Sequence, residues 1–503
     1  MSALGYEFLR RQPGIHALPP RRIAQLRPVT RVERLEAEIA VPRAVAPDTD
    51  GVLDHILFAL KHEGTNLQVL AQALPLVEPG SLVAALRAAP NGRYIRIACH
   101  LWEQFTGKAL EDLPAIGGQV APMFDPKEYV TTPGVRDPRW RVLFNGLGSP
   151  EYCATVERTR QIVEGMDSDI LGRANAFLRE IGPGMADRAL AWAYLHETES
   201  SFEIERETPN QTRAEAYVAL LRQAHEKHPL DEEYLAALQS ATVLNPFDRA
   251  SGFRDTQNWL RGPIRGAAGV TYLPPPPALA RELMSGLMRF ANESPRQTDP
   301  IVAAAVSSFG FVFIHPFMDG NGRLSRFLFH QALCQSGHLE HGMLLPVSVA
   351  MRRHEDLYLA ALQSFSKPAR AFWQASWIDE DHMDFEFNGS PAIYRFWDAT
   401  ACVEFSFQMA AQALDKDLRQ ETEFLRHYDT LYRAINDEFD VRNNDLATLV
   451  LACLQHDGTV SKRRRKQFAD RVPESVFDAL ERHARALLAP APRNGTGGSA
   501  LCP

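Results

Sequence analysis

Residues 315–326 read HPFMDGNGRLSR, and this stretch indicates how the centre of the chain folds. Before it, Asp299 is followed by a proline, which is a typical helix start because the carboxylate caps free backbone N–H groups and the proline has none to lose. The apolar residues that follow predict a core helix that ends before Pro316, because proline cannot continue a helix. A second apolar helix is expected over residues 322–337. The stretch therefore predicts a short loop between two core helices, with His315 at the end of the first.

The loop has the features of an anion site. Its two glycines, Gly320 and Gly322, allow unusual backbone angles, so that successive N–H groups can point inward at the start of the second helix. Arg323 and Arg326 are three residues apart and therefore neighbours on the first turn, where like charges repel one another and oppose the helix dipole. A bound polyanion, or a carboxylate in its place, makes this arrangement favourable. The loop therefore predicts a phosphate site.

Two more side chains in the loop suit chemistry at a phosphate. Asp319 supplies a carboxylate oxygen, and Mg²⁺ usually binds through one carboxylate together with substrate phosphates. His315 has an ordinary pKa near neutrality, so it could accept a proton from a nucleophile that attacks phosphorus. The alternative is a plain helix-loop-helix corner in which the glycines only make the turn.

These residues match the motif of the Fic (filamentation induced by cAMP) family, HPFx[DE]GNGRxxR, at every defined position, and the chain resembles the adenylyltransferase-type members of that family. Gly322 favours nucleotidyl transfer, because the related Doc branch, which resembles a kinase, carries lysine there. The resemblance implies these roles: general base for His315, Mg²⁺ ligand for Asp319, phosphate contacts for Gly320, Asn321 and Gly322, contacts with the β/γ end of ATP for Arg323 and Arg326, and loop anchor for Phe317.

A β-hairpin is expected in this otherwise helical region. Strand-like runs at residues 256–260 and 270–273 flank a segment with glycine and proline, and four prolines follow at residues 274–277. The hairpin resembles the Fic flap, which docks a target segment in extended form by strand addition. A structural β-arm without target docking is the alternative. The flap residues implied by the resemblance are Thr256, Gln257, Asn258, Trp259, Val270, Thr271 and Tyr272.

Residues 195–205 resemble the inhibitory helix of the family, [ST]xxxE[GN], with Ser201 as the hydroxyl and Glu205 as the glutamate. The resemblance implies that Glu205 pairs with Arg326 and blocks productive binding of the γ-phosphate. One residue departs from the pattern, because Arg206 stands where glycine or asparagine is expected. A bulky cation there could change how the helix ends or compete for Glu205. A solvated helix face rich in glutamate is the alternative.

The whole chain is expected to be mainly α, with a Fic-type helical core that carries the flap. Its 503 residues suggest two to four folding units at about 150 residues each. Residues 1–50 are rich in proline and arginine and are expected to form an arm. Helical periodicity predicts an N-terminal domain at 51–149, a core at 150–368, in which the resemblance places the inhibitory helix, and a C-terminal domain at 369–489. Residues 490–503 are expected to be a flexible tail.

The C-terminal domain leaves a second function open. Residues 447–455, 462–469 and 473–488 fit a helix-turn-helix or winged-helix trio. Residues 462–466 read KRRRK, and these charges fit either a solvated helix face or contacts with DNA phosphates. A net charge of −8 argues against nucleic-acid binding by the whole molecule.

Composition and cysteine pattern indicate the cellular compartment in which the protein is expected. The chain is 45% hydrophobic and 23% charged, which is typical of globular proteins. Its six cysteines lack CxxC pairing, so a reducing compartment and hence a cytoplasmic location are expected. The longest apolar run, residues 301–314, falls short of the roughly 18 residues of a membrane span, and no membrane association is expected.

The resemblance implies a protein adenylyltransferase (AMPylator), a nucleotidyltransferase that uses ATP and Mg²⁺. It would move AMP to a Tyr, Ser or Thr hydroxyl of a target protein or of itself, and pairing of Glu205 with Arg326 would restrain it. The alternatives are a Fic enzyme that removes AMP or uses another nucleotide, a non-catalytic ATP-sensing regulator that binds DNA, and a scaffold. A homo-oligomer is compatible with the sequence.

Overall fold

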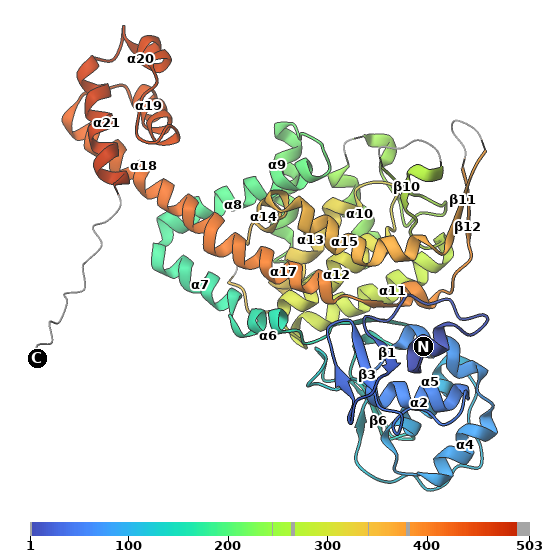
Figure 1. Ribbon diagram of the computed structural model, residues 1–503. Helices are drawn as coiled ribbons and strands as arrows, with labels where there is room; N and C mark the ends of the chain where they lie inside the picture. Colours follow the sequence, from blue (N-terminus) through green and yellow to red (C-terminus); the bar gives the residue numbers. More distant parts are fainter. Residues whose placement is uncertain (1–2, 244, 263–266, 341, 379–382, 490–503) are drawn as a thin grey trace, which may run out of the picture. The chain divides into compact units, whose positions relative to one another are not determined.

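The computed structural model describes residues 3–243, 245–262, 267–340, 342–378 and 383–489. Most of these residues lie in helices, as the sequence predicts (Figure 1). The chain divides into two compact units, Met1–Glu180 with Ala193–Leu414 and Ile181–Trp192 with Asp415–Pro503. The expected N-terminal and core domains therefore share one unit. Residues 369–414, which were assigned to the C-terminal domain, belong to that unit as well.

Residues 3–50 are folded and do not form the expected arm. Tyr6 and Leu9 are buried against the helices that follow, and Ile39 and Val41, which belong to a small sheet, are buried in a separate apolar cluster. In this sheet, one pair of strands is parallel and the other antiparallel, in the order β1-β3-β2. The prediction was wrong because the apolar residues of this segment fall in elements too short to show a period. These elements are α1 (Gly5–Arg10), β1 (Ile23–Leu26), β2 (Glu33–Arg34) and β3 (Glu38–Val41).

The next stretch begins with the expected helices but continues as short strands. The helices are α2 (Val52–His62), α3 (Leu67–Ala73), the 3₁₀ turn Leu74–Leu76, α4 (Pro79–Ala88) and α5 (Arg93–Thr106). The strands are β4 (Ala121–Pro122), β5 (Val135–Asp137), β6 (Val142–Phe144), β7 (Leu147–Ser149) and β8 (Tyr152–Thr155). The wholly helical domain expected at 51–149 is therefore wrong for its second half.

Within the part of the chain that the structure describes, no single helix is long and apolar enough to cross a membrane. Two helical stretches, Leu67–Leu76 and Pro79–Ala88, reach the necessary length and composition only together, and the chain bends by 105° between them.

The predicted helix-loop-helix is confirmed as α12 (Pro300–Ile314) and α13 (Asn321–Gln335), which pack against each other (Figure 1). The carboxylate of Asp299 caps α12 by accepting from the N–H groups of Ile301 and Val302 at 2.9 and 3.2 Å. Nearly all of α12 is buried, because it is apolar on every side and neighbouring helices surround it.

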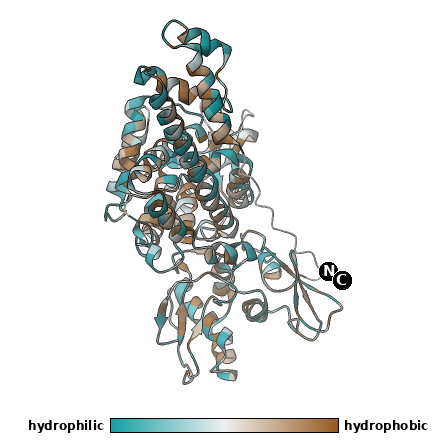
Figure 2. Ribbon diagram, turned by 90° about the vertical axis from the view of Figure 1, so that its left-hand side faces the viewer, coloured by the Kyte–Doolittle hydropathy of each residue, from teal (hydrophilic) through white to brown (hydrophobic). Residues whose placement is uncertain are grey.

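The remaining helices of the first unit enclose this pair. Many of them are amphipathic, and Figure 2 shows hydrophobic and hydrophilic residues together along the same helices. They are α6 (Arg160–Asp167), α7 (Ile170–Ile181), α8 (Pro183–Ile204), which belongs to this unit only from Ala193 on, α9 (Gln211–Gln223), α10 (Glu232–Thr242), α11 (Pro277–Glu293), α14 (Val347–Arg353), α15 (Glu355–Arg370), α16 (Ala392–Arg395) and α17 (Thr400–Gln412). Three 3₁₀ turns lie among them at Pro246–Asp248, Ala267–Gly269 and Ser294–Arg296.

Between residues 256 and 390 of the first unit the described chain forms two hairpins, and only one of them was expected. The expected hairpin pairs β9 (Leu260–Arg261) with β10 (Val270–Tyr272). Its first strand is shorter than predicted, because residues 256–259 are irregular. The second hairpin pairs β11 (Trp373–Trp377) with β12 (Met383–Phe387), and β13 (Phe396–Asp398) joins β8 in a further small sheet. The hairpins touch where the rings of Trp259 and Phe385 lie 5.0 Å apart.

The second unit contains most of the C-terminal helices and has its own apolar core. Its helices are α18 (Arg419–Glu438), α19 (Asn443–Gln455), α20 (Lys462–Phe468) and α21 (Glu474–Leu488), and a π-helical stretch, Ala413–Leu418, precedes them. The described residues of this unit include no strand, so they do not contain the β-hairpin wing that a winged helix requires. Arg465, the fourth residue of the basic run, pairs with Glu474, Asp478 and Glu481 of α21. DNA binding stays a prediction, and the tail expected at 490–503 lies outside the described residues.

Candidate functional site

His315 ends α12 in a left-handed conformation, with φ 52° and ψ 60°. Its backbone N–H still donates to the carbonyl of Phe311 at 2.8 Å, and its Nδ1 lies 3.2 Å from the carbonyl oxygen of Val312. Because a carbonyl can only accept, Nδ1 carries the proton and the lone pair is on Nε2. Burial lowers the pKa of His315 to about 4, so the imidazole is neutral at neutral pH. The side chain is therefore in the form that a general base requires.

A buried arginine that the sequence analysis assigned no role supports this turn. Arg254 donates from Nε to the carbonyl of His315 at 2.8 Å, and its backbone N–H donates to the carbonyl of Pro316 at 2.8 Å. Its two remaining nitrogens donate to the carbonyls of Thr256 and Pro275. Burial lowers the pKa of Arg254 to about 10, which still leaves it charged. The residue types around Arg254 gave no chemical reason to assign it this role.

Asn321 closes the loop onto itself. Its Oδ1 accepts from the N–H of Phe317 at 3.0 Å, and its Nδ2 donates to the carbonyl of the same residue at 2.8 Å. Asn258 donates to that carbonyl as well, at 2.9 Å. The ring of Phe317 is fully buried and meets Phe253 edge to face. Phe317 thus sits where a loop anchor should, while the side chain of Asn321 is already bound to the backbone of the loop.

The two glycines lie at the start of α13, as predicted. Gly320 has φ 85°, and a Cβ at this position would come within 3.2 Å of Val243. A Cβ on Gly322 would come within 1.9 Å of Oε1 of Glu205. The space above Gly322 at the positive end of α13 therefore holds a carboxylate. A carboxylate of the chain itself thus lies where the sequence predicts a bound anion.

Arg326 meets the predicted inhibitory helix, which is the last part of α8. Its Nε donates to Oγ of Ser201 at 2.7 Å, and its Nη2 donates to the carbonyl of Ser201 at 2.7 Å and to Oε1 of Glu205 at 2.8 Å. Tyr217 of α9 lies behind this pair, 3.2 Å from Oγ of Ser201, and donates to the carbonyl of Arg323 at 3.0 Å. Ser201, Glu205 and Arg326 thus form one connected group.

A buried network holds α8 in place one turn earlier. Glu197 is fully buried, and its Oε1 lies 2.7 Å from Nε2 of His330 on α13. The same carboxylate accepts from both the backbone N–H and the hydroxyl of Ser348 on α14, at 2.8 and 2.5 Å. Because all three partners are buried, this network fixes the position of α8 against the motif helix.

The end of α8 explains the unusual Arg206. This residue has φ 60°, a left-handed conformation that favours glycine or asparagine. The N–H of Arg206 donates to the carbonyl of Glu203 at 2.9 Å, and the N–H of Glu207 donates to that of Phe202 at 3.0 Å. These two hydrogen bonds form the Schellman turn in which many helices end. The arginine therefore ends the helix just as the expected residue types would.

Arg323 has a partner that the sequence analysis missed. Its Nη1 donates to Oε2 of Glu207 at 2.8 Å and to the carbonyl of Thr242 at 3.0 Å. Its guanidinium also lies over the ring of Phe202, 5.2 Å from the centroid. Burial raises the pKa of Glu207, and the charge of Arg323 counteracts this effect. The only signal in the sequence was a second glutamate two residues after the inhibitory one.

Asp319, the predicted Mg²⁺ ligand, has a partly exposed carboxylate beside Arg323. Its side chain is 44% exposed, and its carboxylate lies 3.4 Å from Nη2 of Arg323 while Oδ1 accepts from the N–H of Gly320. In the described part of the chain, no three His, Cys, Asp or Glu side chains converge on one metal position. A single open carboxylate nevertheless fits Mg²⁺, which binds through one or two carboxylates, substrate phosphates and water.

The predicted flap residues differ in what they contact. Asn258 bonds to the motif loop as described, and Tyr272 donates from its hydroxyl to the carbonyl of Phe313, near the end of α12, at 2.5 Å. The side chains of Thr256, Gln257 and Thr271 contact Met318, Pro274 and Leu260. Trp259 and Val270 pack toward the second hairpin. In β9, both Leu260 and Arg261 are exposed.

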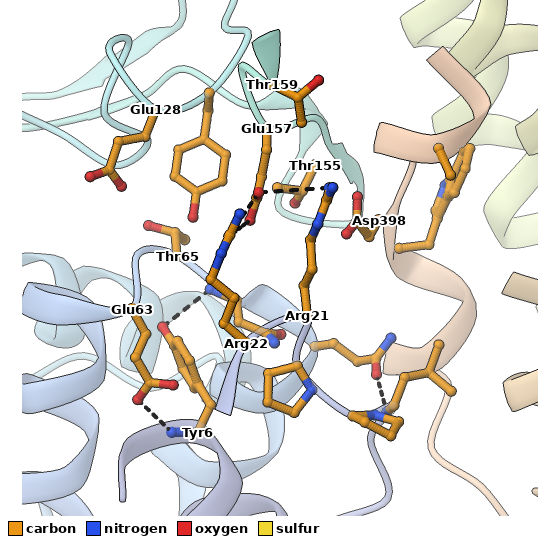
Figure 3. A pocket seen from close by; sticks show the side chains of 18 of the residues that line it. Tyr6, Arg21, Arg22, Glu63, Thr65, Glu128, Thr155, Glu157, Thr159 and Asp398 are labelled. Atoms are coloured by element: carbon orange, nitrogen blue, oxygen red, sulfur yellow. Dashed lines mark hydrogen bonds and ion pairs between the residues drawn. The ribbon is translucent and has the colours of Figure 1, made fainter. Parts of the chain in front are cut away.

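A cavity of about 780 Å³ lies elsewhere in the first unit, away from the motif (Figure 3). Arg21 and Arg22 both point toward Glu157, at 3.7 and 2.9 Å. Burial raises the pKa of Glu63 to about 8. The described residues that line this cavity include none of the predicted motif residues.

Comparison with known proteins agrees with the motif. Residues 229–333 match the model of the Fic/DOC family. Protein adenylyltransferase fic-1 of Caenorhabditis elegans is 33% identical over 92 residues, which are 18% of each protein. Protein adenylyltransferase Fic of Culex quinquefasciatus is 32% identical over 124 residues, which are 24% of this chain and 22% of that protein. The chain thus spans about a fifth of the length of these curated relatives.

Two solved structures are similar as well. A Fic family protein from Desulfovibrio desulfuricans G20 superposes with a TM-score of 0.37 at 20% identity, covering 61% of this chain and 87% of that chain. Fic-1 from Caenorhabditis elegans superposes with a TM-score of 0.30 at 16% identity, covering 72% and 91%. Residues 229–333, which match the Fic/DOC family model, thus include the complete motif.

Proposed function

We propose that this chain is a protein adenylyltransferase that moves AMP from ATP to a hydroxyl of a target protein or of itself. The observation that carries the proposal is a carboxylate in the predicted anion site. The carboxylate of Glu205 lies over Gly322 and binds Arg326, and its charge acts to raise the pKa of His315, which burial lowers. An anion-binding turn beside a base in its reactive form suits attack on a nucleotide phosphate. The names of the relatives above support the same reaction, over about a fifth of their length.

In the proposed reaction the hydroxyl oxygen of a target Tyr, Ser or Thr attacks the α-phosphorus of ATP in line with the leaving group. Nε2 of His315 accepts the hydroxyl proton as the new P–O bond forms. The bond from the α-phosphorus to its bridging oxygen breaks, and pyrophosphate leaves. The amides of Gly320 and Gly322 and the guanidinium groups of Arg323 and Arg326 would stabilise the phosphate charge.

Asp319 would hold Mg²⁺ together with the phosphates. When bound, this ion would neutralise part of the negative charge of the phosphates. The open edge of β9 would align the target segment by strand addition, because Leu260 and Arg261 are exposed there and β9 has a paired strand on its other side.

We further propose that the enzyme rests in an inhibited state. Glu205 competes with ATP for Arg326 and for the helix N-terminus at Gly322, so both must be vacated before the phosphates bind. The cytoplasmic location expected from the cysteines is also part of the proposal. In the described chain these are free thiols at Cys99, Cys153, Cys334, Cys402 and Cys453.

The test is transfer of label from ATP carrying a radioactive α-phosphate. Purified full-length Glu205→Gly should become labelled, or should label co-purifying proteins. The additional change His315→Ala should reduce the rate by about 10²- to 10⁴-fold, the usual contribution of a general base. Equal labelling rates in the two proteins would refute the mechanism, and label from γ-phosphate instead of α-phosphate would indicate phosphoryl transfer.

A further inference from the structure

Both arginines of the proposed nucleotide site form an ion pair with a glutamate, and only one of these pairs was expected. Glu205 binds Arg326, and Glu207 binds Arg323, each at 2.8 Å. We propose that Glu207 is a second inhibitory residue, so that the resting site holds two carboxylates in place of two phosphate groups of ATP. The inference rests on the proposed function in one respect, namely that these arginines bind the phosphates of ATP.

The contacts of Arg323 show what Glu207 contributes. The side chain of Arg323 is only 1% exposed, whereas that of Glu207 is 28% exposed and so can leave toward water. The other carboxylate near this guanidinium belongs to Asp319, at the longer distance of 3.4 Å. Nε of Arg323 is buried and has no hydrogen-bond partner among the described residues. Of these two carboxylates, that of Glu207 is therefore the closer to Arg323, and the guanidinium of Arg323 still has one N–H group without an acceptor in the described part of the chain.

The end of α8 is what allows two alternate residues to reach the same loop. Along a continuous helix, side chains two positions apart point in different directions. The left-handed Arg206 and the Schellman turn around it end the helix between Glu205 and Glu207. As a result, Glu205 reaches Arg326 and Glu207 reaches Arg323 on the first turn of α13. The pair of contacts depends on this turn.

Each carboxylate opposes ATP in a different way. Glu205 lies over the backbone at Gly322 and also binds Arg326. Glu207 pairs with Arg323, and burial opposes its charge in this position. A phosphate that displaced Glu207 would return this carboxylate to water. Glu207 should therefore be the weaker of the two inhibitory contacts, and Glu205→Gly alone should leave the site partly covered.

Calorimetric titration with ATP·Mg²⁺ and with AMP tests the proposal directly, because binding is measured without transfer. All variants of the full-length chain carry His315→Ala, which blocks turnover. Glu207→Ala should lower the Kd for ATP about three- to tenfold, the effect of removing one partly exposed charged competitor. The Kd for AMP, which has no β- or γ-phosphate, should change by less than about twofold. Glu207→Gln, which keeps the side-chain shape, should change ATP binding in the same direction.

Two further variants complete the design. Glu205→Gly with Glu207→Ala should bind ATP more tightly than either single variant. Glu203→Ala is the matched control: it removes a glutamate of the same helix that pairs with Arg352, outside the motif, and should leave ATP binding unchanged.

The outcomes separate this inference from the proposed function. If Glu205→Gly tightens ATP binding but Glu207→Ala does not, alone or in the double variant, the second inhibitory contact is refuted and the proposed function stands. If Glu207→Ala tightens AMP binding as much as ATP binding, its effect is not exerted through the β/γ phosphates and the inference fails. If none of these proteins binds ATP, both proposals fail.

Discussion

Nε of Arg254 donates a hydrogen bond of 2.8 Å to the carbonyl oxygen of His315, 61 residues further along the chain. This contact holds the backbone of His315 in its left-handed conformation, which turns the chain from the core helix into the loop. A non-glycine residue pays roughly 1–2 kcal/mol for that conformation, so its surroundings must stabilise it. Arg254 does so with a guanidinium that bonds three backbone carbonyls at once.

Arg254→Leu should therefore impair both the fold and the reaction. Removing the guanidinium leaves the carbonyls of His315, Thr256 and Pro275 without this donor, and the free energy of unfolding should fall by about 2–4 kcal/mol. Transfer should fall at least about tenfold in protein that is still folded, because the base loses its position. Denaturant unfolding and α-phosphate labelling measure the two effects. Arg289→Leu, at an exposed position, is the control and should change neither; full transfer by Arg254→Leu would contradict the assigned role.

The pH dependence of transfer should lack the usual histidine step. The pKa of His315 in the free enzyme is lowered to about 4, so its imidazole is already neutral across the range in which histidines ordinarily titrate. In the Glu205→Gly background, kcat/KM should show no inflection near about pH 6.5 and should decline only toward about pH 4. Removing Glu205, whose charge raises this pKa, should lower it further. An inflection of kcat/KM near about pH 6.5 would show that His315 titrates as an ordinary histidine, and it would contradict the prediction.

The same pKa shift makes stability depend on pH. A histidine whose pKa is lower in the folded than in the unfolded chain binds fewer protons when folded, so acid favours unfolding between the two values. The contribution of His315 to the free energy of unfolding should therefore be lost as the pH falls from about 6.5 toward about 4. The difference in stability between wild type and His315→Gln, followed over this range, measures it. A difference that stays constant with pH would exclude the shift.

The sequence was a good guide wherever a local signal was strong. The N-cap at Asp299, the apolar run after it and the break at Pro316 are all local, and the structure contains the helix and loop that they predict. The three strands of residues 23–41 gave no such signal, because each has only two to four residues. In addition, β1 pairs with a strand that is not its neighbour in the sequence, with Ile23 opposite Glu38. The hairpin of β11 and β12 had a signal that was overlooked: Met383–Phe387 alternates apolar and polar residues.

In the site, what could be predicted were the residues of recognisable motifs. Ser201, Glu205 and Arg326 meet as the resemblance to the inhibitory helix implied. Glu207 and Arg254 belong to no motif or period, and their partners lie 116 and 61 residues away. Such pairs depend on how helices pack, which no short stretch of sequence encodes.

Glu205→Gly should raise transfer or self-modification several-fold, because it frees Arg326 and the helix N-terminus at Gly322 together. Ser201→Ala removes only one hydrogen bond to the same guanidinium and should have a smaller effect in the same direction. Initial rates of labelling measure both. Unchanged or lower activity in Glu205→Gly would point to a different role for this residue, such as assistance in the hydrolytic removal of AMP.

Arg206→Gly should strengthen the inhibited state. Glycine adopts the left-handed conformation of this position without the cost of a side chain, so the turn that presents both glutamates should gain about 1 kcal/mol. Basal transfer should then fall about two- to fivefold, and the free energy of unfolding should rise slightly. Asp457→Gly is a matched control, since Asp457 has φ 50° in the other unit: it should raise stability and leave transfer unchanged. A rise in transfer for Arg206→Gly would mean that the arginine itself supports inhibition.

Asp319→Asn should separate the binding of Mg²⁺ from the binding of the nucleotide. Asparagine keeps an oxygen that can accept from the N–H of Gly320, so the loop should stay closed, but the charge that attracts a divalent cation is lost. Transfer in the Glu205→Gly background should fall at least about a hundredfold, and half-maximal activity should require about tenfold more Mg²⁺. Binding of ATP in the absence of Mg²⁺ should be unchanged or tighter, because a negative charge 3.4 Å from Arg323 has been removed. Calorimetry and a Mg²⁺ titration of the labelling rate measure these effects, with the exposed Asp255→Asn as control. If Asp319→Asn kept the same Mg²⁺ requirement as its parent, the ion would have to be held elsewhere, and the assignment of this carboxylate would be wrong.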